Sequence, residues 1–401
     1  MSIRRGGAFH IIKRALILTR NVWIIGGLVL VLLAIIELAS GIIVNTKQKL
    51  TTPAIDSRVN ADSYRGATWT EDYYGEFGEI TLRWKPYVHY QRKPFQGEYI
   101  TVDEQGHRGT VYPRLRDSQS TPLRVFMFGA STMWGTGARD EYTVASLVGK
   151  ILSEKGVAAD VTNFAESGYV STQEVIALLL ELRGGNIPDV VVFYDGIGDA
   201  FAAFQSGVAG RPMNEYRRIR EFNLLHESRT RDLTKMYILS HLERSNTVRL
   251  LQAIVRRLRP DAEFRGRLTD SGREAGDSAT VEEDVVDTWI ANMRIVKRLG
   301  EAYGFTPILY WQPVIFTKDE LSEYEQKELE KKQSMEAFFL KTYAYMKRSH
   351  ERLAGQHFHD ISDIFKDAKE PYYIDFAHVS ESANEVLGRR MAADILETTG
   401  K

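Results

Sequence analysis

The stretch that decides the fold reads Arg124-Val-Phe-Met-Phe-Gly-Ala-Ser-Thr-Met-Trp-Gly-Thr-Gly137. Its apolar run, residues 125–128, is rich in β-forming residues and is typical of a strand buried on both faces. Gly129 ends the run, Ser131 follows at once, and residues 141–155 continue with helical spacing. A serine delivered to a helix start in this way is well placed as a nucleophile, because backbone N–H groups of the turn can face a developing oxyanion. The alternative interpretation is a serine that only caps the helix.

The alternation of apolar runs and helical spacing continues along the chain. It predicts a helix over 171–182 and further strands over 160–165, 189–194 and 306–311. Such alternation is typical of an α/β protein with a doubly wound parallel sheet, whose ligands bind at the carboxyl ends of the strands. Ser131, Gly168 and the loop 195–199 each follow the carboxyl end of a predicted strand.

A polar pair stands near the carboxyl end of the chain, where Asp375 and His378 are three residues apart and a helical pattern follows over 381–396. A histidine can accept the proton of a serine hydroxyl, and a carboxylate can fix its tautomer and stabilise the imidazolium. Asp-x-x-His is a common pattern, so its meaning depends on Ser131.

Combined in this order, these segments resemble the SGNH (GDSL-like) hydrolase family over about residues 124–399. The resemblance implies a flavodoxin-like α/β fold with Ser131 as nucleophile, His378 as base and Asp375 as the partner that orients the histidine. It also implies the backbone N–H groups of Ser131 and Gly168 as oxyanion donors, and neither cofactor nor metal. The matching blocks are Gly129-Ala130-Ser131, Gly168, Asp195-Gly196-Ile197-Gly198-Asp199 and Asp375-x-x-His378.

Two positions depart from the family pattern. Ala130 replaces the usual aspartate, and Gly198 replaces the asparagine whose side chain is an oxyanion donor. Losing one such donor typically costs on the order of 10²–10³ in rate. Either another group fills the gap, such as a water held by the Gly198 backbone, or the site is slow or no longer hydrolytic. Asn163 is expected too far toward the strand interior to substitute. Because it would restore a donor, Gly198→Asn is expected to raise turnover of a small activated ester. Glycine at 198 is also expected to supply a positive φ, which asparagine tolerates, so the loop is expected to survive this change.

Composition limits the class of protein. The chain has 401 residues, a net charge of −1 and no cysteine. Near-neutral charge argues against a general nucleic-acid binder, and the lack of cysteine excludes disulfides, thiolate zinc sites and a cysteine nucleophile.

The amino-terminal region predicts a single-pass membrane anchor. Residues 1–21 are basic, and residues 22–44 are almost wholly apolar. About 23 residues at 1.5 Å each cover roughly 34 Å, enough to cross a bilayer core. The basic flank places the amino terminus in the cytoplasm and the remaining chain in the periplasm or cell exterior. A cleaved signal peptide is the alternative, although the only candidate cleavage zone, residues 37–40, fits the small-x-small rule poorly.

Glu37 is the one carboxylate in this apolar run. We interpret it as a protonated or snorkelling residue of a lone helix, and a helix–helix contact through Gly26, Gly27 or Glu37 is the alternative.

The remaining segments divide into four expectations. Residues 45–122 form a stalk with a small β-rich elaboration, in which a turn falls at Gly106 and His107 is structural. Residues 123–401 form the hydrolase-like domain. An insertion over about 207–280 forms a helical cap with a mobile loop, and its basic cluster, 256–259, is either a solvated helix face or a contact for anionic polymer or lipid. Residues 320–350 form one long surface helix.

These expectations combine into a membrane-anchored serine esterase or acyl hydrolase that uses a Ser-His-Asp triad. The expected substrate is an ester, with O-acyl groups of an envelope polysaccharide suggested by the anchor alone. An O-acyltransferase with the same triad is one alternative, and an impaired binding protein that keeps the fold is another. A third interpretation, a phosphate-binding turn over 129–137, lacks the P-loop lysine and the Gly-x-Gly-x-x-Gly spacing.

Overall fold

The computed structural model describes residues 5–50, 56–115, 121–227, 245–248, 250–251, 254 and 280–401. The chain divides into two compact units, the first made of residues 1–54 and 220–266 and the second of residues 55–219 and 267–401. Much of the predicted insertion, 207–280, lies outside the described residues. Its basic cluster 256–259 lies wholly outside them.

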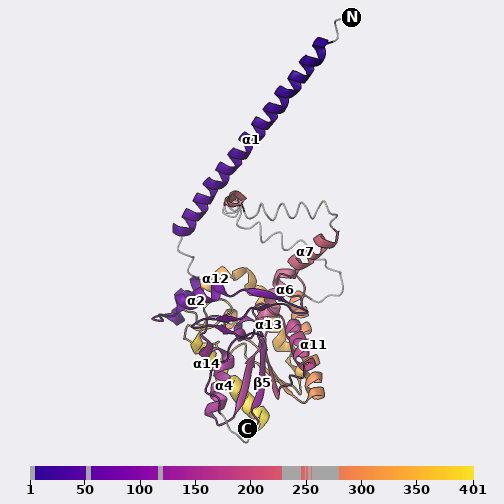
Figure 1. Ribbon diagram of the computed structural model, residues 1–401. Coiled ribbons are helices and arrows are strands. Elements are labelled where there is room, and N and C mark those ends of the chain that lie inside the picture. The colour runs from indigo at the N-terminus through magenta and orange to yellow at the C-terminus, as the bar shows by residue number, and fades with distance from the viewer. Residues whose placement is uncertain are drawn as a thin grey trace. The chain divides into compact units, whose positions relative to one another are not determined.

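The first unit is dominated by the helix α1 (Arg5–Leu50), drawn in indigo in Figure 1. Its segment Leu18–Ile43 is long and apolar enough to cross a membrane and lies near the amino terminus. The large apolar side chains of this segment are exposed in the protein, as expected of side chains that contact lipid. The predicted apolar helix is therefore confirmed, either as a membrane anchor or as a signal sequence.

The second unit is built on a five-stranded parallel sheet, which confirms the predicted α/β class. Its strand order is β6-β5-β7-β8-β9, which is the flavodoxin-like order 2-1-3-4-5 of doubly wound sheets. The central strand β7 is buried along its whole length, as its unbroken apolar run predicts. The strands are β5 (Leu123–Gly129), β6 (Ala159–Asn163), β7 (Val190–Asp195), β8 (Thr306–Trp311) and β9 (His357–Asp360).

Helices cover both faces of this sheet, as Figure 1 shows. One face carries α4 (Val144–Glu154) packed on α14 (Glu381–Thr399). The other carries α5 (Ser171–Arg183), α6 (Ile197–Ser206), α11 (Val281–Tyr303) and α13 (Gln333–Ser349).

The single helix expected over 320–350 is wrong. The chain forms α12 (Glu323–Lys331), a break at Lys332, and then α13. A capping box between Ser322 and Glu325 starts α12. Charged residues with helical spacing flank the break on both sides, so the pattern of residue types does not reveal it.

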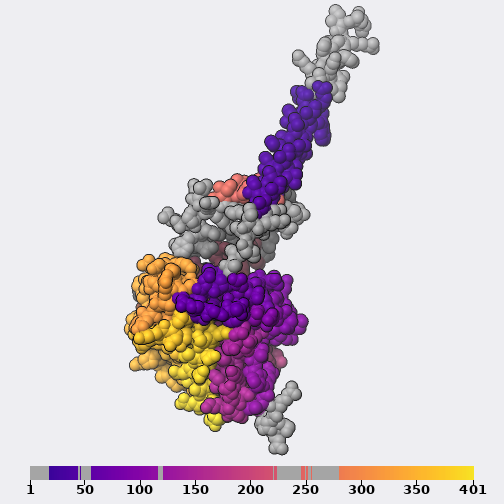
Figure 2. All heavy atoms as spheres, turned by 90° about the vertical axis from the view of Figure 1, so that its left-hand side faces the viewer, coloured from indigo at the N-terminus to yellow at the C-terminus, as the bar shows by residue number. Residues whose placement is uncertain are grey.

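The elaboration that precedes the sheet belongs to the same compact unit. Its purple residues lie beside the yellow carboxyl-terminal segment in Figure 2. Gly106 forms the predicted turn, with a φ of 90° and its N–H donating to the carbonyl of Asp103. The elements of this region are η1 (Ser57–Asn60), η2 (Asp62–Tyr64), α2 (Thr70–Glu79), β1 (Leu82–Lys85), β2 (His89–Arg92), β3 (Phe95–Gln96) and β4 (Thr101–Val102).

Short elements complete the described parts of the chain. They are α3 (Ser131–Trp134), η3 (Asp140–Tyr142), α7 (Glu215–Glu227), η4 (Ile315–Thr317) and η5 (His350–Leu353).

Candidate active site

The structure brings Ser131, His378 and Asp375 into one hydrogen-bonded row. Nε2 of His378 lies 2.7 Å from Oγ of Ser131, and Nδ1 of His378 lies 2.7 Å from Oδ2 of Asp375. Ser131 follows strand β5, and the other two residues precede α14. These distances are within the range of a nucleophile, its base and the group that orients the base.

The turn before Ser131 has no room for a side chain at position 129. A Cβ atom on Gly129 would lie 2.8 Å from the carbonyl oxygen of Tyr194 and 2.7 Å from Cβ of Met133. The serine is the first residue of α3, and the N-cap of this helix is Ala130, which makes no side-chain cap. The interpretation of Ser131 as a capping serine therefore does not describe this site.

The Asp375 carboxylate is held by three donors. Its Oδ1 accepts the backbone N–H groups of Ala377 at 2.9 Å and His378 at 2.8 Å, and its Oδ2 faces the imidazole. Burial raises the pKa of Asp375, but the attraction and hydrogen bonds of His378, with a smaller effect of Arg58, outweigh it and hold the pKa well below its usual value. The carboxylate is therefore ionised and fixed in orientation.

Arg58 is a charged neighbour of the row that the sequence analysis missed. Its Nη1 lies 3.6 Å from Oδ2 of Asp375, while its Nε and Nη2 donate to the two oxygens of Asp56 at 2.9 and 2.7 Å. The guanidinium also lies over the rings of Tyr74 and Phe77. One arginine of the elaboration thus bridges two carboxylates and reaches the acid of the row. The Asp-x-Arg spacing in η1 carries no signal of this contact, because the contact joins residues that are far apart in sequence.

Strand β2 supports the second block of the site. Arg92 forms a buried ion pair with Glu166, and its Nη2 donates to Oγ of Ser167 at 3.0 Å. Tyr90 donates to the carbonyl of Ser167 at 3.1 Å. These contacts hold the residues that directly precede Gly168.

The predicted oxyanion donors have free N–H groups. Within the part of the chain that the structure describes, no hydrogen bond uses the backbone N–H of Ser131 or of Gly168. Gly168 has a φ of 78°, and a Cβ atom there would lie 2.8 Å from the hydroxyl of Tyr90. Glycine at 168 is therefore required by both backbone angle and space.

Gly198 differs from its expectation. The positive φ of this turn belongs to Gly196, at 127°, and Gly198 lies in the first turn of α6. A Cβ atom on Gly198 would lie 2.5 Å from the carbonyl oxygen of Tyr169 and 3.2 Å from Cβ of Ala130. The positive φ expected at Gly198 is therefore wrong, and the Tyr169 carbonyl closes the space that a side chain at this position would need.

Asn163 does not replace the missing donor. Its amide donates to the carbonyl of Met133 at 3.0 Å, and its Oδ1 accepts the N–H of Ala165 at 3.1 Å. The side chain is fully buried, as its predicted place in the strand implies.

Three buried carboxyl groups lie at the carboxyl end of β7 and beside it. Burial raises the pKa of Asp199 to about 7 and that of Asp195 to about 6. Burial and the nearby Asp195 raise the pKa of Glu174 well above its usual value. Ser171 donates to Asp199 at 2.7 Å, and the indole of Trp289 donates to Asp195 at 2.9 Å. These groups, which we call the carboxyl cluster, bind protons more tightly than ordinary carboxyl groups do.

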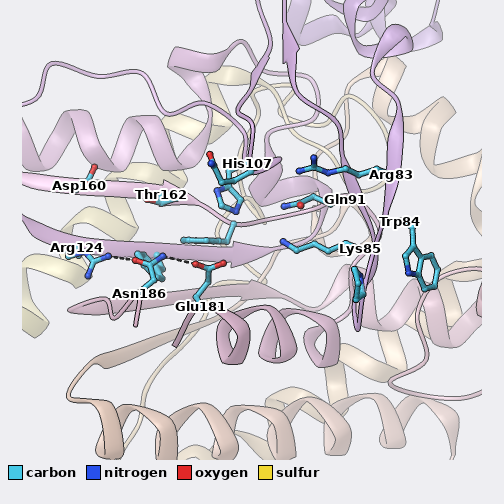
Figure 3. A pocket seen from close by; sticks show the side chains of 14 residues that line it. Arg83, Trp84, Lys85, Gln91, His107, Arg124, Asp160, Thr162, Glu181 and Asn186 are labelled. Carbon is cyan, nitrogen blue, oxygen red and sulfur yellow. Dashed lines mark hydrogen bonds between the residues drawn. The ribbon is translucent and has the colours of Figure 1, made fainter. Parts of the chain in front are cut away.

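A separate cavity of about 580 Å³ lies between the hairpin β1–β2 and the β6 edge of the sheet (Figure 3). Lys85 and His107 face it from one side, and Glu181 and Asn186 from the other. Burial lowers the pKa of Lys85. None of the residues of the Ser131–His378–Asp375 row lines this cavity, so it is distinct from the candidate active site.

No family model matches the chain, and no curated protein matches its sequence. Several solved structures are similar to it. An acetyl xylan esterase is 12% identical over 68% of this chain and 98% of that chain, with a TM-score of 0.35. A catalytic mutant of an acetylxylan esterase from Geobacillus stearothermophilus is 14% identical over 69% and 93%, with a TM-score of 0.37.

A psychrotrophic esterase from Pseudoalteromonas sp. is 11% identical over 70% of this chain and 100% of that chain, with a TM-score of 0.33. The names of these structures are those of esterases, the class that the sequence motifs resemble. The function proposed below rests on the side chains of the site itself.

Proposed function

We propose that this protein is a serine esterase or acyl hydrolase in which Ser131 is the nucleophile, His378 the general base and Asp375 the orienting carboxylate. The observation that carries the proposal is the unbroken row from Ser131 Oγ through both nitrogens of His378 to Asp375. An ionised carboxylate at the end of such a row favours the histidine tautomer that accepts a proton at Nε2.

The chemistry follows from this arrangement. Nε2 of His378 takes the hydroxyl proton as Ser131 attacks the ester carbonyl, and the resulting imidazolium is stabilised by Asp375. The same proton then passes to the leaving alcohol. Water, deprotonated by His378, then attacks the acyl carbon of the acyl-enzyme. The bond from this carbon to Oγ of Ser131 breaks, His378 returns the proton to Oγ, and the acid is released. The free N–H groups of Ser131 and Gly168 are the proposed donors to the oxyanion.

The oxyanion side is the weak part of the site. With Gly198 in place of an asparagine, the hole has two backbone donors and no side-chain donor, so we expect turnover below that of a complete hole by on the order of 10²–10³. This same feature favours a second candidate function, a binding protein that keeps the fold. The intact row argues for the enzyme, because binding alone does not require a serine aligned with a histidine.

The proposed substrate is an O-acyl group of an envelope polysaccharide, which would be within reach of a site tethered to the membrane. The proposed location is a single-pass anchor with the catalytic unit in the periplasm or cell exterior. An acceptor hydroxyl in place of water would make the same row an O-acyltransferase.

A fluorophosphonate probe tests the proposal directly. Full-length protein in detergent is expected to label at Ser131, and Ser131→Ala is expected not to label. Thr132→Ser, a neighbouring hydroxyl change outside the row, is the matched control and is expected to label normally. Folded wild-type protein that neither labels nor cleaves p-nitrophenyl acetate would favour the binding protein.

A further inference from the structure

Glu37 has hydrogen-bond partners in a second segment, in contrast to the snorkelling residue of a lone helix that the sequence analysis preferred. Its Oε1 accepts the backbone N–H of Asn246. Its Oε2 accepts the N–H and the hydroxyl of Thr247, at 3.1 and 2.8 Å. These partners belong to the insertion, and both segments lie in the same compact unit. The contact joins residues that are 209 and 210 positions apart in the sequence.

The contact supplies hydrogen-bond acceptors for the first N–H groups of a helix. Residues 246–248 are helical, and the first N–H groups of a helix have no partner within it. Ser245 accepts the N–H of Val248 at 3.2 Å, and Glu37 accepts the two N–H groups before it. A carboxylate at this position is also favoured by the helix dipole.

The two segments approach closely along the next turn of α1. Ser40 is only 5% exposed, and its hydroxyl lies 3.4 Å from that of Thr247. A Cβ atom on Gly41 would lie 3.0 Å from Nδ2 of Asn246. Small residues at 40 and 41 therefore admit the second segment.

This contact lies near the end of the apolar segment. The 26 residues Leu18–Ile43 rise about 39 Å, against a hydrocarbon core of about 30 Å. Glu37 stands six residues before Ile43 and hence about 9 Å from that end. If the excess length is shared between the two sides, its backbone lies roughly 5 Å inside the hydrocarbon boundary, where an unpartnered carboxylate would be costly.

Apolar side chains of the second segment remain uncovered. Leu251 is 56% exposed and Ile254 is 46% exposed, and they stand three residues apart, on one side of a helix. A pair of exposed aliphatic side chains anchored beside a membrane-spanning helix fits the acyl-chain boundary of a bilayer.

We propose that the segment described at residues 245–248, 250–251 and 254 is a second membrane element, docked on α1 through Glu37, with Leu251 and Ile254 in contact with lipid at the bilayer interface. The insertion is then part of the membrane unit. The helix α1 is also part of the finished protein, because removal of the chain up to residues 37–40 would delete the partner of this element.

The docking can be tested by crosslinking, since the natural chain has no cysteine. Full-length Ser40→Cys/Thr247→Cys protein, oxidised in membranes, is expected to form an intrachain disulfide. The control Gly27→Cys/Thr247→Cys, which moves one cysteine about 20 Å along α1, is expected to form none. Glu37→Leu is expected to abolish the Ser40–Thr247 crosslink, while Glu37→Gln, which keeps an acceptor, retains part of it. Equal crosslinking of the two pairs, or no crosslink in either, would overturn the docking.

The lipid contact needs a second readout. Single cysteines at Leu251 and Ile254, labelled with nitrobenzoxadiazole, are expected to emit at shorter wavelength in phosphatidylcholine–phosphatidylglycerol vesicles than a label at Glu323→Cys. Their emission is expected to be lost with brominated lipid, and that of the control retained. Water-like emission without quenching, in protein that still crosslinks, would overturn the membrane role and indicate a contact with solvent or another protein.

Discussion

The two sides of the candidate active site differ in how completely their groups are hydrogen-bonded. On the side of the proposed nucleophile, Ser131, His378 and Asp375 each have their partners within 2.9 Å. On the side of the proposed oxyanion hole, two backbone N–H groups make no hydrogen bond to any residue that the structure describes. The third position there is a glycine whose side-chain space is closed by the Tyr169 carbonyl.

This difference shows that the two departures from the family pattern are one local change. Ala130 and Gly198 face each other, since a Cβ on the glycine would lie 3.2 Å from that of the alanine. Two small residues let the Tyr169 carbonyl approach the turn. Adding one side chain at position 198 is therefore not expected to complete the hole, because the Tyr169 carbonyl occupies the space that its Cβ would need.

The largest effect is expected on the nucleophile side. Ser131→Ala and His378→Ala are each expected to lower kcat by 10³-fold or more, and the double mutant by little more than either, because the residues act as one unit. Asp375→Ala is expected to cost less. The measurement is steady-state hydrolysis of p-nitrophenyl acetate. Losses that multiply in the double mutant would show two independent residues and break the comparison.

A smaller effect is expected on the oxyanion side. The structure reverses the expectation that Gly198→Asn would raise turnover. An added Cβ must displace the Tyr169 backbone, and overpacking of this kind costs about 1–3 kcal/mol, so Gly198→Asn is expected to lower kcat/KM about tenfold. Gly198→Ala adds the Cβ without a donor and is the matched control, expected to lose as much. A gain in the asparagine variant alone would show that the hole still has room for a donor.

A substitution of Arg58 changes the charge near Asp375 without removing a hydrogen bond of the Ser131–His378–Asp375 row. Arg58→Gln removes a positive charge near Asp375, so the carboxylate stabilises the imidazolium more strongly. The acid limb of the kcat/KM profile is then expected to move to higher pH by roughly half a unit, the size of a Coulomb effect of about 0.7 kcal/mol. Arg65→Gln removes an exposed arginine paired with Asp62 and is expected to leave the limb in place. An unmoved limb in both variants would make Arg58 a purely structural residue.

The carboxyl cluster predicts a pH dependence of stability. The pKa of Asp199 is raised in the folded state to about 7, so between about pH 4 and 7 the folded protein binds more protons than the unfolded chain. The contribution of Asp199 to the free energy of unfolding should therefore be largest near pH 4 and fall as pH rises through this window, by on the order of 1–3 kcal/mol.

Urea unfolding of the full chain in detergent, followed by tryptophan fluorescence, measures this slope. Asp199→Asn is expected to flatten it, while Asp160→Asn, a half-exposed surface carboxyl, is not. A slope that is unchanged in Asp199→Asn would assign it to other groups.

The sequence predicts this fold well where a segment consists mainly of apolar residues. The apolar runs place β7 and β8 to within one residue and β5 to within two, and the order of the motif blocks points to Ser131, Asp375 and His378. The features that the sequence does not predict depend on contacts between residues that are far apart in the chain. Arg58 meets Asp375 from the far end of the chain, and the Tyr169 carbonyl closes on Gly198 through a turn whose path no local pattern encodes. Glu37 finds its partner some 200 residues later.

The proposed docking at Glu37 would change what releases the second unit from a membrane. The chain passes between the two units after residue 54, between residues 219 and 220, and between residues 266 and 267. If α1 alone were the anchor, a single protease cut in the stalk would free the second unit. If the segment described at residues 245–248, 250–251 and 254 is also held at the membrane, as proposed, a cut near residue 54 leaves the other two connections intact, and the second unit stays attached. Release would then require cleavage in the stalk and on both flanks of the insertion.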